Sequence, residues 1–157
     1  MGKKDISDIL QFLEPFNAPT AELALWLRAF AWDNFPDCNE LIYDNYNAVA
    51  VGWAPTLTMG DIFCSVAVYS NKSVHFGFYW GSSLHDPKGL LLGNGKQYRY
   101  LRVSSQKDFP ADYAKKLMEE AHVNSLAGAR NLASAPKGMT VVQSISPTKK
   151  RPISKSA

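Results

Sequence analysis

Acidic residues clustered between residues 33 and 44 are the first candidates for chemistry. Four of them are separated by steps of four, three and four residues: Asp33, Asp37, Glu40 and Asp44. On a continuous helix this spacing would place all four carboxylates on one face, and oxygen ligands suit hard or borderline cations such as iron. Pro36 interrupts a helix here, and if residues 39–44 form a strand, only Glu40 and Asp44 share a face. The pattern therefore predicts either a weak iron site or an ordinary solvated edge.

A glycine-rich segment that leads into an expected strand is the second candidate. Its residues of interest are Gly93, Gly95, Lys96, Tyr98, Arg99 and Arg102. Glycines let backbone amides approach an anion, and Lys or Arg supplies charge. Strand alternation places Lys96, Tyr98 and Arg102 on one face, with Arg99 on the other. Gln97 stands where a Walker loop has Ser or Thr, so that loop is excluded. The segment predicts either a site for a phosphate-type anion or small molecule, or a turn whose cations pair with acidic residues.

Aromatic residues form the third candidate, and several fall on expected strands: Trp53, Tyr69, Phe76, Phe78, Trp80, Tyr98 and Tyr100. An aromatic sheet face beside cations can stack nucleic-acid bases. The alternative is a core, since Val74, Phe76 and Phe78 alternate onto one strand face that helices would cover. Residues 1–120 hold 11 basic and 14 acidic residues, net −3. We therefore expect no nucleic-acid partner, apart from weak contacts through the basic tail.

Residues able to catalyse a reaction show no recognisable arrangement. The three histidines, His75, His85 and His122, are not spaced like metal ligands. Cys38 and Cys64 lie 26 residues apart without ligand spacing, which predicts reduced, structural thiols. There is no Gly-x-Ser-x-Gly motif of a nucleophile elbow. The sequence thus favours a binding protein over an enzyme.

The elements that would position these groups follow from hydrophobic periodicity. Apolar residues at helical spacing predict helices over residues 5–16, 20–35 and 111–126. Alternation and β-branched or aromatic content predict strands over residues 46–53, 62–69, 74–80 and 98–103. Helices, then strands, then a helix indicate one α+β domain over residues 5–130. We expect a mostly antiparallel sheet of four to five strands with N-terminal and C-terminal helices packed on one face, and the other face wet.

Charge is unevenly distributed along the 157 residues. Residues 121–157 contain six basic residues and no acidic one, and the segment is rich in Ser, Pro and Ala. Such a composition offers little to bury, so residues 131–157 are expected to form a basic, flexible tail. Its cluster Lys149, Lys150 and Arg151 could contact phosphates, or could simply be solvated. No apolar run reaches the roughly 18 residues of a membrane span, and no secretory signal is recognisable, so we expect a cytoplasmic protein.

Several short strings of the chain resemble one family. They are YDNYNAVAVG at residues 43–52, HFGF at residues 75–78, DPKGLL at residues 86–91 and GNGKQ at residues 93–97, followed by Arg99 and Arg102. Over residues 20–125 the chain is similar to the YdhG-like group of bacterial domains of unknown function. The resemblance implies a helix–sheet–helix sandwich. One branch of that family is described as a frataxin-like iron chaperone, so the resemblance also implies iron handling.

The expected function therefore has two forms. The first is a non-enzymatic cytoplasmic binding protein of the frataxin-like, iron-binding kind, with iron at the four carboxylates named above. The alternative is a domain that binds a small molecule or anion through the loop at residues 93–96 and the aromatic strand face. The partner is thus a small ligand or a metal ion, and the oligomeric state is left open.

Overall fold

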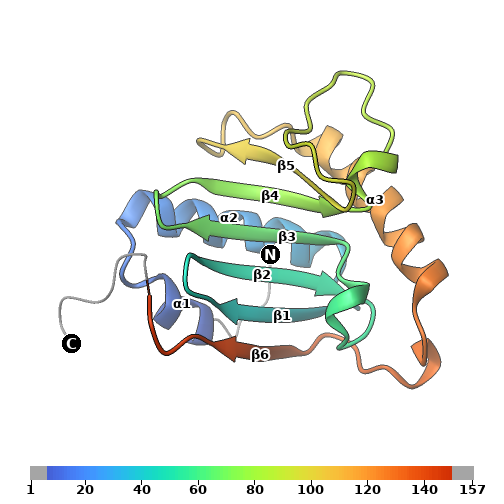
Figure 1. Cartoon of the computed structure of the whole chain (residues 1–157), viewed down its shortest axis with the longest axis horizontal. Helices are drawn as coiled ribbons and strands as arrows, with labels where there is room; N and C mark the ends of the chain where they lie inside the picture. The colour runs from blue at the N-terminus through green and yellow to red at the C-terminus, as the bar shows by residue number, and fades with distance from the viewer. Residues whose placement is uncertain (1–6, 150–157) are drawn as a thin grey trace.

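The structure is a computed structural model of the chain, and it describes residues 7–149. Figure 1 shows one sheet with the helices gathered on one of its faces. The helices are α1 (Ser7–Leu13), α2 (Ala18–Asn34) and α3 (Ala111–Gly128). The strands are β1 (Asn39–Asp44), β2 (Ala48–Ala54), β3 (Cys64–Tyr69), β4 (Val74–Tyr79), β5 (Tyr98–Val103) and β6 (Thr140–Ile145). Short 3-10 turns follow at η1 (Met59–Asp61), η2 (Gly81–Ser83) and η3 (Leu132–Ser134).

The expected α+β class is confirmed, but the details of the sheet differ. The strand order across the sheet is β5-β4-β3-β2-β1-β6, with six strands rather than four or five among the described residues. Strands β1 to β5 form an antiparallel meander, whereas β6 lies parallel to β1. The sheet is therefore mixed, and its last strand comes from the segment expected to be a flexible tail.

Hydrogen bonds around the start of β1 explain why this segment is ordered. The buried side chain of Asn39 donates to the Pro136 carbonyl at 2.8 Å and accepts from the Met139 amide at 3.0 Å. The Gly138 amide donates to the Cys38 carbonyl at 3.0 Å. Composition could not predict this result, because the pairing depends on residues about 100 positions earlier.

The end of the same segment is also bound to the domain. Lys149 forms an ion pair with Asp44 at 3.4 Å and donates to the Asp44 carbonyl at 3.3 Å. Lys149, one of the three basic residues expected to contact phosphates, is thus paired with an acidic residue of the domain. Its neighbours Lys150 and Arg151 lie outside the described residues.

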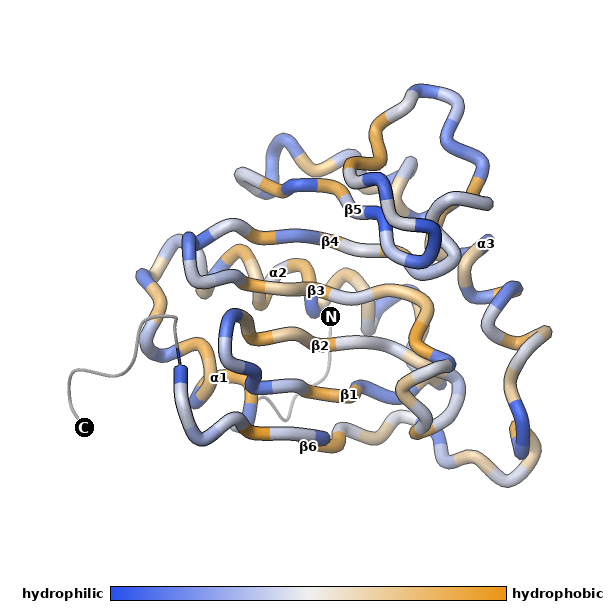
Figure 2. The backbone as a smooth tube through the Cα atoms, in the orientation of Figure 1, coloured by the Kyte–Doolittle hydropathy of each residue, from blue (hydrophilic) through white to orange (hydrophobic). Residues whose placement is uncertain are grey.

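A row of buried side chains crosses the sheet on the helix side. The strand register aligns Ile42, Val51, Val66, Phe76 and Leu101 on neighbouring strands, and each is at most 5% exposed. The helices cover this row, because Phe30 of α2 and Phe109 before α3 pack against Phe76 with ring centroids 6.0 and 5.4 Å away. Figure 2 shows hydrophilic residues at the turn between β3 and β4, away from this core.

A buried ion pair joins α2 to β1 within the same layer. Glu40 lies on the helix side because it is two residues from Ile42 and so shares its face of the strand, and it is 0% exposed. The Arg28 guanidinium donates to both of its carboxylate oxygens, at 2.5 and 2.7 Å. The Thr140 hydroxyl of β6 donates to the same carboxylate at 2.7 Å. This network connects a helix, the inner strand and the edge strand of the sheet.

Candidate functional site

The sheet face opposite the helices carries small residues in its centre and aromatic residues along β4 and β5. The register places Gly52, Ser65 and Gly77 in one row, and Ala50, Ala67 and His75 in the next. The aromatic side of this face comprises Tyr69, His75, Tyr79, Tyr98 and Tyr100. Because α1, α2 and α3 all lie on the other side, this face is the surface that the sequence predicts to be available for recognition (Figure 1).

Gly77 lets an aromatic ring lie flat against the sheet. A Cβ atom at this position would stand 2.2 Å from Cε1 of Tyr98, so any larger residue would displace the ring. Tyr98 then packs edge-to-face with Tyr79 at 5.4 Å and stacks near Tyr100 at 5.9 Å. Burial in this layer raises the pKa of Tyr98 above its usual value. Neutral phenol rings therefore cover the β4–β5 side of the face.

His75 lies in the middle of this aromatic layer. Its ring stacks on Tyr100 with centroids 4.0 Å apart and planes 4° from parallel, and Tyr69 packs on it at 4.6 Å. Among the described residues, neither ring nitrogen has a hydrogen-bond partner, and both are shielded from solvent. Burial lowers the pKa of His75, and the nearby charge of Arg102 lowers it further. The imidazole is thus held neutral beside a cation.

Acid should destabilise the protein through His75 and His122, since burial lowers the pKa of His122 as well. Below about pH 6.5, the ordinary histidine pKa, the unfolded chain gains protons that the folded protein resists. The free energy of unfolding is therefore constant above that pH and decreases below it, down to the lowered folded pKa values. We expect the melting temperature to fall by a few degrees between pH 7.5 and pH 5.

Variants distinguish this effect from the titration of carboxylates. His75→Phe and His122→Phe should each make the melting temperature less dependent on pH between 5 and 7.5, measured by circular dichroism. His85 is exposed, so His85→Asn serves as the matched control and should leave the slope unchanged. If the melting temperatures of all three variants depended equally on pH, the attribution of the acid effect to His75 and His122 would be wrong.

A small pocket lies at the end of the sheet where β4 begins and β5 ends. Its volume is about 230 Å³, and it opens between the start of α2, the turn from β3 to β4 and the end of β5. The lining residues are Pro19, Thr20, Leu23, Lys72, Ser73, Val74, Arg102, Val103 and Ser104. Two of them are cations and none is acidic. Leu23, Val74 and Val103 line it from the helix side of the sheet, whereas Arg102 pairs across the strands with His75 of the aromatic face.

The two cations of this pocket come from separate elements. Lys72 occupies the turn with a φ of 69°, and its amide donates to the Tyr69 carbonyl at 2.8 Å. Arg102 follows on β5 and is exposed. Among the described residues, neither side chain forms an ion pair. Their charges are therefore available to a ligand.

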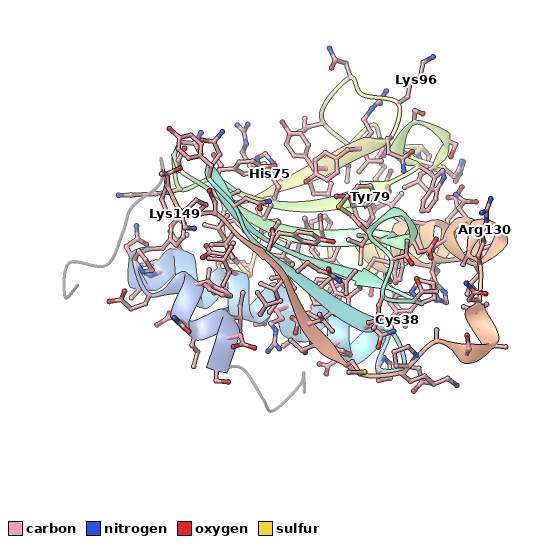
Figure 3. The ribbon with its side chains drawn as sticks, turned by 60° about the horizontal axis from the view of Figure 1, so that its bottom comes forward. Cys38, His75, Tyr79, Lys96, Arg130 and Lys149 are labelled. Atoms are coloured by element: carbon pink, nitrogen blue, oxygen red, sulfur yellow. The ribbon has the colours of Figure 1, made fainter. Side chains whose placement is uncertain are left out.

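The predicted anion-binding residues are only partly brought together. Tyr98 and Arg102 share the open face, and Arg99 lies on the opposite one, as strand alternation predicts. The Arg99 side chain instead donates to the Gly95 carbonyl at 2.6 Å. Gly93, with a φ of 95°, and Lys96 lie in the loop before β5, and Figure 3 shows Lys96 away from His75. Of the predicted anion-binding cations, Arg102 lines the pocket and Lys96 lies apart from it. Lys72, which was not predicted, is the second cation of the pocket.

Asp86 organises the loop that holds these glycines. Its carboxylate accepts hydrogen bonds from the amides of Leu90 and Leu91 at 2.9 and 3.0 Å, and from the Tyr113 hydroxyl of α3. Burial alone would raise the pKa of Asp86, but these hydrogen bonds lower it below its usual value. Leu92 then pairs with Tyr100 as an isolated bridge. The loop therefore pairs with part of the outer edge of β5, and ligand binding by its glycines stays a prediction.

The four carboxylates of the predicted iron site have different surroundings. Glu40 is buried against Arg28, and Asp44, at the other end of β1, pairs with Lys149. Asp33 near the end of α2 and Asp37 after it are exposed. Within residues 7–149, no three His, Cys, Asp or Glu side chains are grouped so that they could hold a metal ion. Iron binding therefore stays a prediction without a site in this part of the chain.

Sequence reasoning missed Lys72 and the pocket that it lines. The signal available was the turn Ser70-Asn71-Lys72-Ser73, in which a lysine occupies a left-handed position. A turn at this position places Lys72 beside the end of the neighbouring strand, where Arg102 lies. Recognising the site required the pairing of β4 with β5, which the sequence predicts only as two strands.

Fold and site together define the class as an α+β domain with an open aromatic sheet face and an adjoining cationic pocket. Comparisons with family models, curated proteins and solved structures give no match. Membership of the YdhG-like family stays a prediction that rests on the quoted strings. Among the described residues, no helix has the length and apolar character needed to cross a membrane.

Proposed function

We propose that the protein is a binding protein for a small phosphate-type anion, held between Lys72 and Arg102. The observation that carries this proposal is the charge of the pocket: two cations and no acidic residue line it. The part of the sequence that contains both cations is not basic overall, since residues 1–120 carry a net charge of −3. A local cluster of positive charge on an acidic body favours a specific anion over a general polyanion.

The chemistry of the lining residues suits a phosphate group. Arg102 offers a planar guanidinium that can donate two parallel hydrogen bonds to phosphate oxygens, and Lys72 adds a compact charge. Hydroxyl groups of Thr20, Ser73 and Ser104 lie around the same space and can donate further hydrogen bonds. At about 230 Å³ the pocket is smaller than the roughly 300 Å³ and more of drug-sized sites. It fits an anionic group rather than a whole nucleotide.

The aromatic face supplies a second contact for such a ligand. Arg102 stands opposite His75, whose ring stacks on Tyr100. Tyr69 and Tyr100, which pack on His75, are half-exposed, so a planar group attached to the phosphate can pack against them while the anion stays beside Arg102. The proposed ligand is therefore a phosphate ester that carries a planar substituent. This refines the anion-binding alternative by using Arg102 and Tyr100 together with Lys72.

Titration with phenyl phosphate and with inorganic phosphate tests this function. Calorimetry should show that phenyl phosphate binds more tightly than inorganic phosphate, because only the former has a ring to stack. Arg102→Gln and Lys72→Gln should each weaken both ligands about tenfold or more, the expected effect of losing a hydrogen bond to a charged group. The measurement is the dissociation constant at low ionic strength.

Two exposed cations outside the pocket provide matched controls. Lys96→Gln and Lys137→Gln remove the same charge from the protein without changing the pocket lining. Both should leave the dissociation constants unchanged. If Lys96→Gln weakened binding as much as Arg102→Gln, the ligand would be held by the loop before β5 or by net charge, and the proposed site would be wrong.

A further inference from the structure

A second and larger cavity lies at the other end of α2 from the anion pocket. Its volume is about 490 Å³. The residues that line it are Asn34, Phe35, Pro36, Asp37, Cys38, Pro55, His122, Leu126, Leu132, Ala133, Ala135, Pro136 and Lys137. It therefore opens between the residues after α2, the second half of α3 and the connection from α3 to β6. Figure 3 shows Cys38 and Arg130 at this end of the molecule, with Lys149 at the opposite end.

The cavity arises because α2 ends early and the connection from α3 to β6 passes at a distance from it. Helix α2 ends at Asn34, and Pro36 prevents its continuation. After α3 ends at Gly128, the connection turns at Asn131, with a φ of 56°, and at η3. Hydrogen bonds from Asn39 to Pro136 and from Gly138 to Cys38 then hold the connection against the start of β1. These two hydrogen bonds fix the wall of the cavity that the connection forms, so the cavity is part of the folded structure.

Most of the cavity wall is apolar, and one imidazole is built into it. The apolar side chains include two that are strongly exposed for leucines, Leu126 at 37% and Leu132 at 41%. His122 stands between Phe35 and Phe63, with ring centroids 4.8 and 4.9 Å away. Burial lowers its pKa, so the ring is neutral near pH 7 and offers one donor and one acceptor nitrogen.

The remaining polar residues indicate which ligands the cavity excludes. Asp37 and Lys137 bring one charge of each sign, so the lining has no net charge to attract an ion. Burial, together with the charge of Asp37, raises the pKa of Cys38 to about 12. The thiol is therefore protonated, which excludes covalent capture by a thiolate. A neutral ligand is the one consistent with this lining.

We infer that this cavity binds a small, uncharged, mainly apolar ring compound whose single polar group hydrogen-bonds to His122. The volume falls within the roughly 300–1,000 Å³ of small-molecule sites. Planar rings of such a ligand pack against Phe35, and Leu126 and Leu132 lose solvent exposure when it binds. The site shares no lining residue with the anion pocket, so it is independent of the proposed function.

Indole is a suitable probe, because it is a neutral bicyclic ring with one N–H donor. Titrated into ¹⁵N-labelled protein, it should shift the amide signals of Leu126, Leu132 and their neighbours. Ala135→Trp places a large side chain in the lining and should abolish these shifts. Ala127→Trp makes the same change on α3 outside the lining and should leave the indole dissociation constant unchanged. The amide spectrum of each variant reports whether it remains folded.

A second variant tests the hydrogen bond to His122 without filling the cavity. His122→Phe keeps an aromatic ring between Phe35 and Phe63 but removes both nitrogens. Indole binding should weaken about fivefold, as the loss of one neutral hydrogen bond implies, whereas toluene, which has no donor, should bind equally well. Indole shifts that persist in Ala135→Trp, or that centre on another region, would overturn the inference. Phenyl phosphate should bind to Ala135→Trp as it does to the parent protein.

Discussion

Replacing Glu40 with alanine is expected to lower the free energy of unfolding by about 3–5 kcal/mol. Arg28, which is 3% exposed, would lose both hydrogen bonds that it donates to the Glu40 carboxylate, and the Thr140 hydroxyl would lose the bond that it donates there. Removing one partner of a buried ion pair costs more than the intact pair contributes to stability, because the desolvation of the remaining charge is no longer offset by that partner. Urea denaturation followed by circular dichroism measures the change, and a total stability of about 5–15 kcal/mol makes it a large fraction.

Two further variants separate charge from packing at this position. Glu40→Gln keeps the volume and should still be strongly destabilising, since a neutral amide has one oxygen acceptor in place of the two carboxylate oxygens that accept from Arg28. The double variant Arg28→Met with Glu40→Leu should recover most of the stability, because it removes both charges. Glu22→Ala on the exposed surface of α2 is the control and should change stability by less than about 0.5 kcal/mol. A Glu40→Ala protein as stable as this control would contradict the assigned ion pair.

Ending the chain after Ala135 should have an effect of similar size, on the order of 5 kcal/mol. This change removes β6 and with it Val142, which packs against the main core, and Val141, which packs with Leu41. The backbone of β1 would become an exposed sheet edge, and Glu40 would lose Thr140. We expect a much lower melting temperature and self-association, seen by size-exclusion chromatography, because a bare strand edge pairs with other chains.

A chain that ends after Lys149 is the matched control for this truncation. It retains every described strand and the ion pair of Lys149 with Asp44. Its melting temperature should be well above that of the shorter chain. Equal melting temperatures and equal elution volumes would show that β6 contributes little to the sheet. The conservative variant Val142→Ala should fall between the two, as expected for the loss of part of one half-buried side chain.

Local periodicity was sufficient for the elements that bury one regular face. Strand β5 spans Tyr98–Val103, the range that alternation predicts, and α3 spans Ala111–Gly128, two residues longer than the predicted 111–126. The helix-facing side of β4 was also predicted, since Val74, Phe76 and Phe78 are at most 3% exposed. These features depend on neighbours within a few residues, which a sequence displays directly.

Features that depend on distant residues could not be read in the same way. Strand β6 is short and half-exposed, and it is ordered because Asn39 and the β1 edge bind it. The spacing of Asp33, Asp37, Glu40 and Asp44 suits a helix, but a strand begins at Asn39 and turns Glu40 towards Arg28. The available sign that this carboxylate is buried was that Glu40 would share a strand face with the apolar Ile42, two residues along. For the same reason, the meeting of Lys72 with Arg102 required the pairing of two strands.

Helix α2 separates the two pockets, with Pro19, Thr20 and Leu23 lining one and Asn34 lining the other. If α2 moves as a rigid body, binding in one pocket could affect the other only through a shift of α2 along its axis or a rotation about it. Arg28 lies between the two ends and is fastened to Glu40 by two hydrogen bonds. Such a shift would have to break a desolvated, two-point attachment, for which neither ligand offers compensation. We therefore expect that filling one of the two proposed sites leaves the ligand affinity of the other unchanged, which would be zero coupling free energy between them.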